Sequence, residues 1–600
     1  MKRAISKGCL IGALAAAAAA MTEPAFAAVV INVTSTDDTD VNDANCTLRE
    51  AIIAININNS YHGCPNTISA DTIDLPSNIG GTASGPASIS LQSALPVSSG
   101  LPRTIRGKGW EGSVIIGNGL PGLRVSAGTL NVDDVMLMDF GRSASGAAMT
   151  VEAGASGSLD HVWILSAGDE EFSTGGCIQN SGSLGVYYSQ LELCNGFSGG
   201  AIQTFEGSFT TIQNSTILKS HAEHGVINNQ GGTLGLFTST MGANTAGVDA
   251  GAIINKGGSV TIASSTLAYS MFTLGTGSAN VLFNNNGSMH VGNSVIFGDP
   301  SASGSDCVGT ITSDGNNAVR TGAGCNFAAS GDRAVSDPQL QPAPGPESGF
   351  TNLPIGAGGV GRVYLPASTS PLVNQFHGSP QDADQRGVRR NLAGWSDIGA
   401  VQRGNALLVV GNTNLSGGDA YIKSLLTNYG LTVTTVSDTA SASSDANGKT
   451  VVVISESVLS GNVNTKFRAT AAGVVVNEPF LFDDMNMTTA SNLGTSNENT
   501  LNLARTTVGS NAGWIGPTQM GFGSLLSFGW GIPAASAQVQ ASNVGTPSHK
   551  HIFYYPHNST MANGFVAPGR RVGTCFTDAS MAVMQGLGFL EASILLAAGP

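Results

Sequence analysis

The chain has 600 residues, and its 11% of charged residues is well below the ~25% that is usual for soluble domains. The formal net charge of −14 argues against a protein that binds nucleic acid through a basic surface. Hydrophobic residues make up 41% of the chain, which excludes a wholly disordered protein.

The first 27 residues have the pattern of a secretory signal peptide. Lys2, Arg3 and Lys7 are followed by an apolar run from Cys9 to Met21, and residues 25–27 form a small-residue cleavage site. No later stretch has the about 18 consecutive apolar residues of a spanning helix. We therefore expect an exported protein, secreted or on the cell surface, without a transmembrane segment.

Residues 28–100 are interpreted as the N-terminal cap of a repeat protein. The phrase VVINV at 29–33 predicts a strand, and TLREAIIAI at 47–55 has apolar residues at helical spacing. A solenoid of stacked repeats needs a cap on its exposed end, because the open edge would otherwise template aggregation.

A loop in this cap resembles the start of an EF-hand calcium loop, with alternating ligands Asp38, Asp40, Asn42 and Asp43. The loop departs from the EF-hand at its sixth place, where Asp43 replaces Gly, and at its twelfth, where Arg49 replaces Glu. Two interpretations stay open: calcium bound loosely as a cofactor, or a turn rich in Asp and Asn.

One phrase returns every 24 to 28 residues in the middle of the chain. Its copies are GGCIQN at 175–180, GGAIQT at 199–204, HGVINN at 224–229, AGAIIN at 250–255 and SANVLFNN at 278–285. Repeats of this length indicate a solenoid, and short β-branched phrases separated by Gly, Ser and Asn favour strands. The sequence predicts a right-handed parallel β-helix over 101–335, closed by turns at 336–403. The recurring asparagines are expected to stack inside its turns: Asn180, Asn228, Asn229, Asn255, Asn284 and Asn285.

The pattern changes at residue 404. Apolar strands at 406–411, 449–457 and 473–479 alternate with helical segments, among them 418–430. This alternation predicts an α/β domain with a parallel sheet over 404–600, which we expect to fold alone. The strand end at 449–457 has no Gly-x-Cys-x-Gly elbow, so we expect this domain to be non-catalytic.

Seven cysteines follow the predicted cleavage site, and six form near-neighbour couples separated by 18, 17 and 18 residues. In an exported chain this spacing favours disulfides, and the absence of a CxxC motif makes metal binding the weaker interpretation. The couples are Cys46 with Cys64, Cys177 with Cys194, and Cys307 with Cys325. Cys575 is left over and is expected to be a small buried hydrophobe.

Aligning the repeats on their glycine gathers acidic and histidine side chains at one corner. In this alignment Glu223 and Asp249 occupy equivalent positions of neighbouring coils, and a carboxylate pair is what glycosidic cleavage needs. The catalytic candidates are Glu223, Asp249, His221 and His224, and the candidate substrate-binding residues are Asp169, Glu170 and Glu171. A solvated loop edge is the main alternative, and a zinc site through the two histidines is a weaker one. Residues 143–319 contain no arginine, which argues against a lyase of acidic sugars.

Several segments resemble known families. The phrase CTLREAI at 46–52 resembles the N-terminal CSLREA segment of bacterial secreted proteins. The phrases DPQL, SPLV, DQRGVRR and SDIGA within 337–400 resemble the closing region of right-handed parallel β-helix surface proteins, although Gln402 replaces a usual Glu. The GGAI coils are similar to those of polymorphic outer-membrane adhesins. Residues 404–600 resemble the glutamine-amidotransferase-like flavodoxin fold, in LLVVG at 407–411 and APGRRVGTCF at 567–576.

These resemblances imply exposure outside the cell and contact with carbohydrate. We expect an adhesin-like or glycan-binding protein whose partner is an extracellular polysaccharide or a cell-surface glycan. The alternative is a polysaccharide-degrading glycoside hydrolase, or less favourably a lyase, that uses the corner carboxylates. No nucleic-acid partner is expected.

Overall fold

The structure is a computed structural model of the chain. It describes residues 30–66, 71–76, 86–100, 103–110, 112–141, 146–169, 171, 173–273, 278–341, 351–354, 360–378, 381–390, 395–415, 417–503, 518–574, 576 and 584–599. The predicted signal peptide at 1–27, Glu170 and Cys575 lie outside the described residues.

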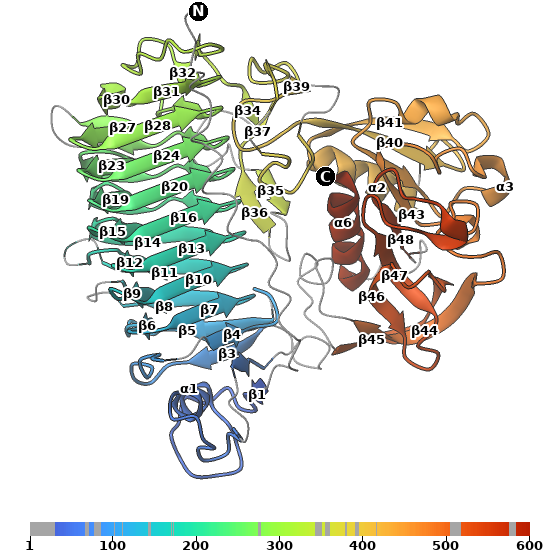
Figure 1. The fold of residues 1–600 in the computed structure, drawn as a ribbon, viewed down its shortest axis with the longest axis horizontal. Coiled ribbons are helices and arrows are strands. Elements are labelled where there is room, and N and C mark those ends of the chain that lie inside the picture. Colours follow the sequence, from blue (N-terminus) through green and yellow to red (C-terminus); the bar gives the residue numbers. More distant parts are fainter. Residues whose placement is uncertain are drawn as a thin grey trace, which may run out of the picture.

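The N-terminal cap contains the predicted helix, α1 (Leu48–Asn56), at one end of the molecule (Figure 1). Thr47 and Glu50 form a reciprocal capping box: the Glu50 amide donates to Thr47 Oγ1 at 3.2 Å, and the Thr47 amide donates to Glu50 Oε2 at 3.0 Å. Leu48 and Ile55 are buried in the same core as the first coils, so the helix covers the end of the stack.

The body is a β-solenoid of about 13 turns, built from three parallel sheets. The first sheet contains β1 (Val30–Asn32), β2 (Thr72–Asp74), β4 (Arg103–Arg106), β7 (Thr129–Asp133), β10 (Ser156–Asp160), β13 (Ser183–Tyr187), β16 (Phe209–Gln213), β20 (Thr233–Phe237), β24 (Ser259–Ala263), β28 (Ser288–Gly292) and β31 (Thr312–Gly315). The second contains β3 (Ala87–Ser90), β5 (Ser113–Ile116), β8 (Met136–Phe140), β11 (Trp163–Ala167), β14 (Gln190–Ser198), β17 (Thr216–Leu218), β21 (Thr240–Gly242), β25 (Thr266–Ala268), β29 (Val295–Phe297), β32 (Ala318–Arg320) and β33 (Arg333–Val335). The third contains β6 (Leu123–Val125), β9 (Met149–Val151), β12 (Ile178–Asn180), β15 (Ile202–Thr204), β19 (Ile227–Gln230), β23 (Ile253–Lys256), β27 (Ala279–Asn285) and β30 (Ser305–Gly309).

The predicted parallel β-helix is confirmed, with one repeat in each coil. In the third sheet Ile178, Ile202, Ile227 and Ile253 stand directly opposite one another on consecutive coils. All four are buried in the core that runs along the axis of the stack. Short corner strands extend the second sheet, namely β18 (His221–His224), β22 (Thr245–Val248) and β26 (Met271–Phe272).

Most of the recurring asparagines are structural, as predicted. Asn229 Nδ2 donates to Asn255 Oδ1 at 2.8 Å, and Asn255 Nδ2 donates to Asn284 Oδ1 at 2.9 Å, which links three coils side chain to side chain. Each of these amides also donates to a backbone carbonyl in its own turn, for example Asn229 to Gly232 at 2.9 Å. Such rows satisfy buried polar groups that would otherwise cost free energy. Asn285 is instead exposed.

Residues 336–403 add no strand to the three sheets in the part of the chain that the structure describes. They form short antiparallel pairs beside the stack (Figure 1): β34 (Leu340–Gln341) with β37 (Leu365–Pro366), β35 (Thr351–Pro354) with β36 (Val360–Val363), and β38 (Phe376–His377) with β39 (Trp395–Ser396). Gln385 accepts from Thr240 Oγ1 at 2.6 Å, and its amide donates to Thr216 Oγ1 at 2.8 Å. We call the described residues of 360–403 the covering segment. They run back over the outer face of the second sheet at β14, β17, β21 and β25.

The C-terminal domain has a nine-stranded mixed sheet. Its order is β41 (Leu431–Ser437), β40 (Gly404–Val410), β42 (Val451–Ile454), β43 (Gly473–Val476), β48 (Arg571–Gly573), β47 (Lys550–Tyr555), β45 (Thr518–Gly531), β44 (Leu493–Leu503) and β46 (Gln538–Asn543). Among the described residues, the helices of this domain are α2 (Gly417–Asn428), α3 (Ser460–Val463), α6 (Met584–Ala598) and the 3-10 turns η1 (Ser443–Ala446), η2 (Pro479–Leu481) and η3 (Ala562–Gly564).

The expected fully parallel sheet is found in only half of this domain. The first five strands are parallel, with the first strand of the domain, β40, between β41 and β42. The other four are antiparallel and include the long pair β44 and β45. Val363, Val388 and Val401 of the covering segment belong to the same hydrophobic core as Leu408 and Ile422, so this segment packs on the C-terminal domain as well as on the stack.

Candidate functional site

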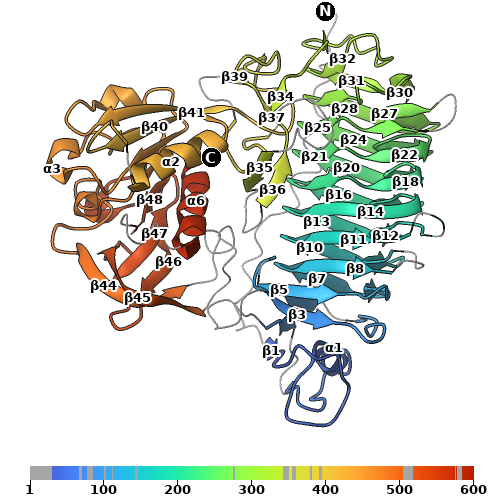
Figure 2. The same ribbon diagram turned by 180° about the vertical axis from the view of Figure 1, so that it is seen from behind.

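The corner strands position the candidate residues of the repeat alignment, on the side of the stack that faces away from the C-terminal domain (Figure 2). In the observed register His221 stands opposite Thr245 and His224 opposite Val248, which places Glu223 beside Gly247. The expected equivalence of Glu223 and Asp249 is therefore wrong. The offset between coils is 24 residues at β18–β22 but 26 at β19–β23, so two extra residues follow β22.

Asp249 is held by two nitrogen donors. Its Oδ2 atom is 2.9 Å from His224 Nδ1 and 3.0 Å from Lys256 Nζ. The exposed ring of Phe197 on the preceding coil meets the His224 ring edge-on, with centroids 5.0 Å apart. These four side chains form a small polar and aromatic cluster that can bind a hydroxyl-rich ligand. The Lys256 ammonium compensates the negative charge of Asp249, and the carboxylate serves as a hydrogen-bond acceptor in this cluster.

The remaining corner residues do not join this cluster through the observed contacts. His221 Nδ1 lies 2.7 Å from Thr245 Oγ1. Asp169 is part of its own loop, because its carboxylate accepts from the Glu171 amide at 2.9 Å and its amide donates to Ser173 Oγ at 2.9 Å. The side chain of Glu171 is exposed.

The outward face of the first sheet carries aromatic rings that lie along its strands. A Cβ atom on Gly185 would fall 2.4 Å from the Tyr187 ring, and one on Gly235 would fall 2.5 Å from the Phe237 ring. Each ring therefore fills the space over the glycine two residues earlier. On the strand between them, Phe209 is 59% exposed. Three adjacent coils thus present aromatic side chains on one face.

Tyr187 and Phe237 stand in one register two coils apart and so form a row along the solenoid axis. This row was not recognised from the sequence, although a signal exists. The phrases SLGVY at 183–187 and TLGLF at 233–237 share a Gly-x-aromatic ending two coils apart. In a strand, residues two apart share a face, so the glycine leaves room for the ring. With strands about 4.8 Å apart, Tyr187 and Phe237 are separated by about 10 Å along the stack.

A second aromatic group lies just after the strands β10 and β13 of the first sheet. The rings of His161 and Tyr188 are stacked, with centroids 5.0 Å apart and planes 6° apart, and Trp110 Nε1 donates to the His161 carbonyl at 2.6 Å. Burial disfavours the charged imidazole, but a hydrogen bond to Asp160 and neighbouring carboxylates outweigh it and raise the pKa of His161. Burial raises the pKa of the Tyr188 hydroxyl. The stacked pair therefore combines a flat ring surface with a positive charge at mildly acidic pH.

The C-terminal domain brings polar side chains together at the carboxyl ends of its parallel strands. Asp419 on α2 accepts from Ser457 Oγ at 2.7 Å and from Ser455 Oγ, next to the point where the strand order reverses. Burial, together with repulsion from Glu456, raises the pKa of Glu478 to about 7. Sequence reasoning searched this strand end for a cysteine and missed the carboxylates.

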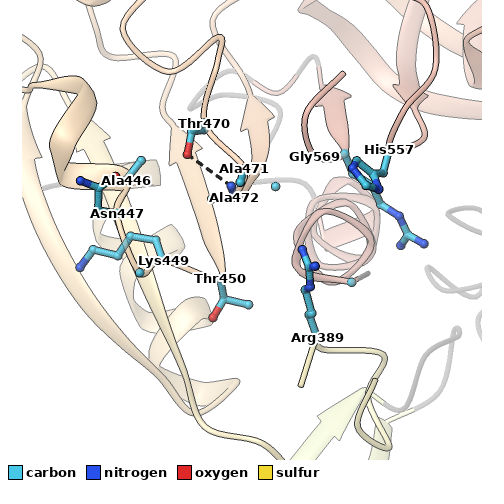
Figure 3. Close-up of a pocket in the computed structure, with 14 residues that line it drawn as sticks. Arg389, Ala446, Asn447, Lys449, Thr450, Thr470, Ala471, Ala472, His557 and Gly569 are labelled. Carbon is cyan, nitrogen blue, oxygen red and sulfur yellow. Dashed lines mark hydrogen bonds between the residues drawn. The ribbon is translucent and has the colours of Figure 1, made fainter. Parts of the chain in front are cut away.

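A cavity of about 340 Å³ lies at the amino ends of the parallel strands (Figure 3). Four of its lining residues are Arg389, Lys449, His557 and Arg570, and none of the described lining residues is acidic. Arg570 also donates to the Leu596 carbonyl at the end of α6, at 2.9 Å. Guanidinium groups suit carboxylates, sulfates and phosphates, whereas the Lys449 ammonium is directed to Thr434 Oγ1 at 2.7 Å.

The four residues of the predicted calcium loop do not converge on one point. Asp38 is buried in an ion pair with Arg49 at 2.7 Å, and it also accepts from the Gln92 amide at 2.7 Å. Asp43 caps the Asn45 amide at 2.7 Å, and the side chain of Asn42 is exposed. Arg49, at the twelfth place of the loop, thus pairs with Asp38, and the Asp38 carboxylate does not join the other three residues in a shared site. Asp40 alone turns toward another potential ligand, His62.

The three cysteine couples are disulfides, as predicted: Cys46–Cys64, Cys177–Cys194 and Cys307–Cys325. No helix among the described residues has the length and apolar character needed to cross a membrane.

Comparison of the sequence with protein-family models and with curated proteins found no match. The fold itself defines the chain as a disulfide-linked parallel β-helix protein joined to a domain with a mixed sheet.

Proposed function

We propose that this protein is exported and contacts an extracellular polysaccharide or cell-surface glycan through the open faces of its β-helix, as an adhesin-like or glycan-binding protein. The observation that carries the proposal is the aromatic row formed by Tyr187 and Phe237, which stand in one register two coils apart. Phe209 adds an exposed ring on the coil between them, where it lies opposite Ser183 and Thr233. The apolar C–H faces of sugar rings stack on aromatic rings, and a row along the solenoid axis suits an extended chain of sugars.

Several features support this proposal. The covering segment lies on the second sheet at β14, β17, β21 and β25, so this part of the second sheet is not open to a ligand. The corner cluster around Asp249 supplies hydrogen-bonding groups of both signs. Three disulfides suit an oxidising compartment, which agrees with export through the predicted signal peptide.

A panel of neutral and acidic polysaccharides tests the proposal, scored for binding and for release of reducing ends. We expect binding to at least one polysaccharide, weakened about 3- to 10-fold by Tyr187→Ala or Phe237→Ala. Phe480→Ala is the matched control, because this exposed aromatic residue lies on the C-terminal domain. Unchanged affinity in both row variants would reject the aromatic row as the contact surface.

Hydrolysis of a polysaccharide is the second candidate function. Glu223 and Asp249 lie on neighbouring coils, but the ion pair of Asp249 with Lys256 does not suit a proton donor. Release of reducing ends by the wild type, abolished by Glu223→Gln and by Asp249→Asn with an unchanged thermal melt, would establish this function instead.

A further inference from the structure

We propose that Asp40, Glu50 and His62 form a binding site for one divalent transition-metal ion, with zinc as the best fit, in the N-terminal cap. One ligand atom from each of these residues lies within 4.8 Å of the others. His62 Nδ1 is 3.1 Å from Asp40 Oδ1 and 3.2 Å from Glu50 Oε1. This site differs in residues and in metal class from the calcium loop expected from the sequence.

The spacing of the donors matches a tetrahedral metal. With metal–ligand bonds of about 2.0–2.2 Å, neighbouring ligands of a tetrahedral zinc ion lie roughly 3.3–3.6 Å apart. The two observed separations from His62 are only slightly shorter, so an ion fits after small side-chain movements. Three protein ligands leave a fourth position for water or for a ligand oxygen.

The surrounding contacts hold these donors in place before any metal binds. Glu50 is 0% exposed, and its two carboxylate oxygens accept from the Val41 and Thr47 amides, each at 3.0 Å. Such second contacts orient metal-binding carboxylates and leave further lone pairs available. The Tyr61 ring lies against the His62 ring, with centroids 4.0 Å apart, and its hydroxyl is 3.5 Å from Asp40 Oδ2.

The disulfide Cys46–Cys64 ties together the chain segments that carry the ligands. Cys46 lies four residues before Glu50, Cys64 lies two residues after His62, and their Cα atoms are 4.7 Å apart. Asp40 and His62 are partly exposed, with side-chain exposures of 40% and 24%, so an ion from solvent can reach them. The site is therefore rigid on its buried side and open on the other.

The donor set selects the metal. Calcium prefers six to eight oxygen ligands, whereas one imidazole nitrogen with two carboxylates suits zinc and related ions. The same contacts would also arise without a metal, from hydrogen bonding of the His62 ring to the two carboxylates. A metal-binding measurement separates these two cases.

The test uses the full chain, stripped with a chelator and titrated with Zn²⁺ by calorimetry, and with Co²⁺ followed by visible absorption. We expect one strong equivalent of Zn²⁺, the d–d bands of a four-coordinate nitrogen and oxygen site for Co²⁺, and a higher Tm in zinc. His62→Ala should weaken binding at least about tenfold and remove both the bands and the Tm shift.

His290→Ala is the matched control, because His290 also lies 3.1 Å from an aspartate, Asp314, but this pair is not part of a group of three potential metal ligands among the described residues. It should bind Zn²⁺ as the wild type does. Asp40→Asn provides a second variant if His62→Ala fails to fold, and it should also weaken the site. Absence of a strong equivalent in the wild type, or equal binding in the wild type and His62→Ala, would overturn the proposal.

Discussion

The carboxylate of Glu223 occupies the space over Gly247 of the next coil: a Cβ atom at position 247 would lie 2.0 Å from Glu223 Oε2. The obstacle is the far end of a flexible side chain. We expect Gly247→Ala to displace this carboxylate while lowering the free energy of unfolding by less than about 1 kcal/mol.

Gly176→Ala is the contrasting variant. A Cβ atom there would meet two backbone carbonyls, 2.1 Å from Asn195 and 2.3 Å from Gly200, which cannot rotate away. We expect a loss of about 2–3 kcal/mol, because overpacking moves the backbone of two coils. Urea unfolding of both variants measures the difference, and equal losses would contradict the role given to the Glu223 side chain.

The disulfide within one coil should stabilise the solenoid. Replacing Cys177 and Cys194 together by serine removes a crosslink with a sequence separation of 17 residues, for which we expect a loss of about 3 kcal/mol. Peptide mapping without reduction should show the pairs 46–64, 177–194 and 307–325. A crosslink between different couples would contradict this pairing.

The buried ion pair of Asp384 and Arg386 should stabilise the packing of the covering segment on the C-terminal domain. Both side chains are 0% exposed and 2.5 Å apart, and Arg386 also donates to the Tyr429 carbonyl. Asp384→Asn should cost about 3–5 kcal/mol, because it leaves a buried guanidinium uncompensated. The double variant with Arg386→Met should cost less than the sum of the single changes in a double-mutant cycle. Additive losses would show that the two charges are not coupled.

The C-terminal domain should lose stability as the pH rises toward neutrality. The pKa of Glu478 is raised from 4.5 to about 7, so between these values the folded state holds more protons than the unfolded state. The free energy of unfolding therefore falls as pH rises through this window. Glu478→Gln should reduce the fall, measured by urea unfolding at about pH 5 and about pH 8. The exposed Glu206→Gln is the control, and an equal pH dependence in wild type and Glu478→Gln would contradict the prediction.

The coils could be predicted because each repeat is one structural unit. Ile178, Ile202 and Ile227 recur in the sequence at the spacing of one coil, and the same residues stand opposite one another in the sheet. The repeat in the sequence therefore predicted how the coils stack. The register at the corner could not be predicted in the same way. Aligning the glycines fixes one point of each coil, but it does not show that two extra residues lie after β22.

The mixed sheet was missed for a different reason. The strand β44 reads LGTSNENTLNL, in which Thr, Ser and Asn predominate, and its alternating apolar face is too sparse to suggest a strand. It pairs antiparallel with β45, the next strand of the chain. The return of Gln385 to Thr240 depends on a contact across 145 residues that no local pattern records.

The row of amide hydrogen bonds through Asn229, Asn255 and Asn284 repeats the same connection at every step. Within the stack each coil contacts only the adjacent ones, so a coil inserted between two of these steps would meet the same neighbours above and below. The length of the body is therefore adjustable in whole coils without redesign of the helical cap, whereas the covering segment, which contacts coils from β14 to β25, would have to change with them. Such a molecule can change its reach by duplication or loss of a segment of about 25 residues.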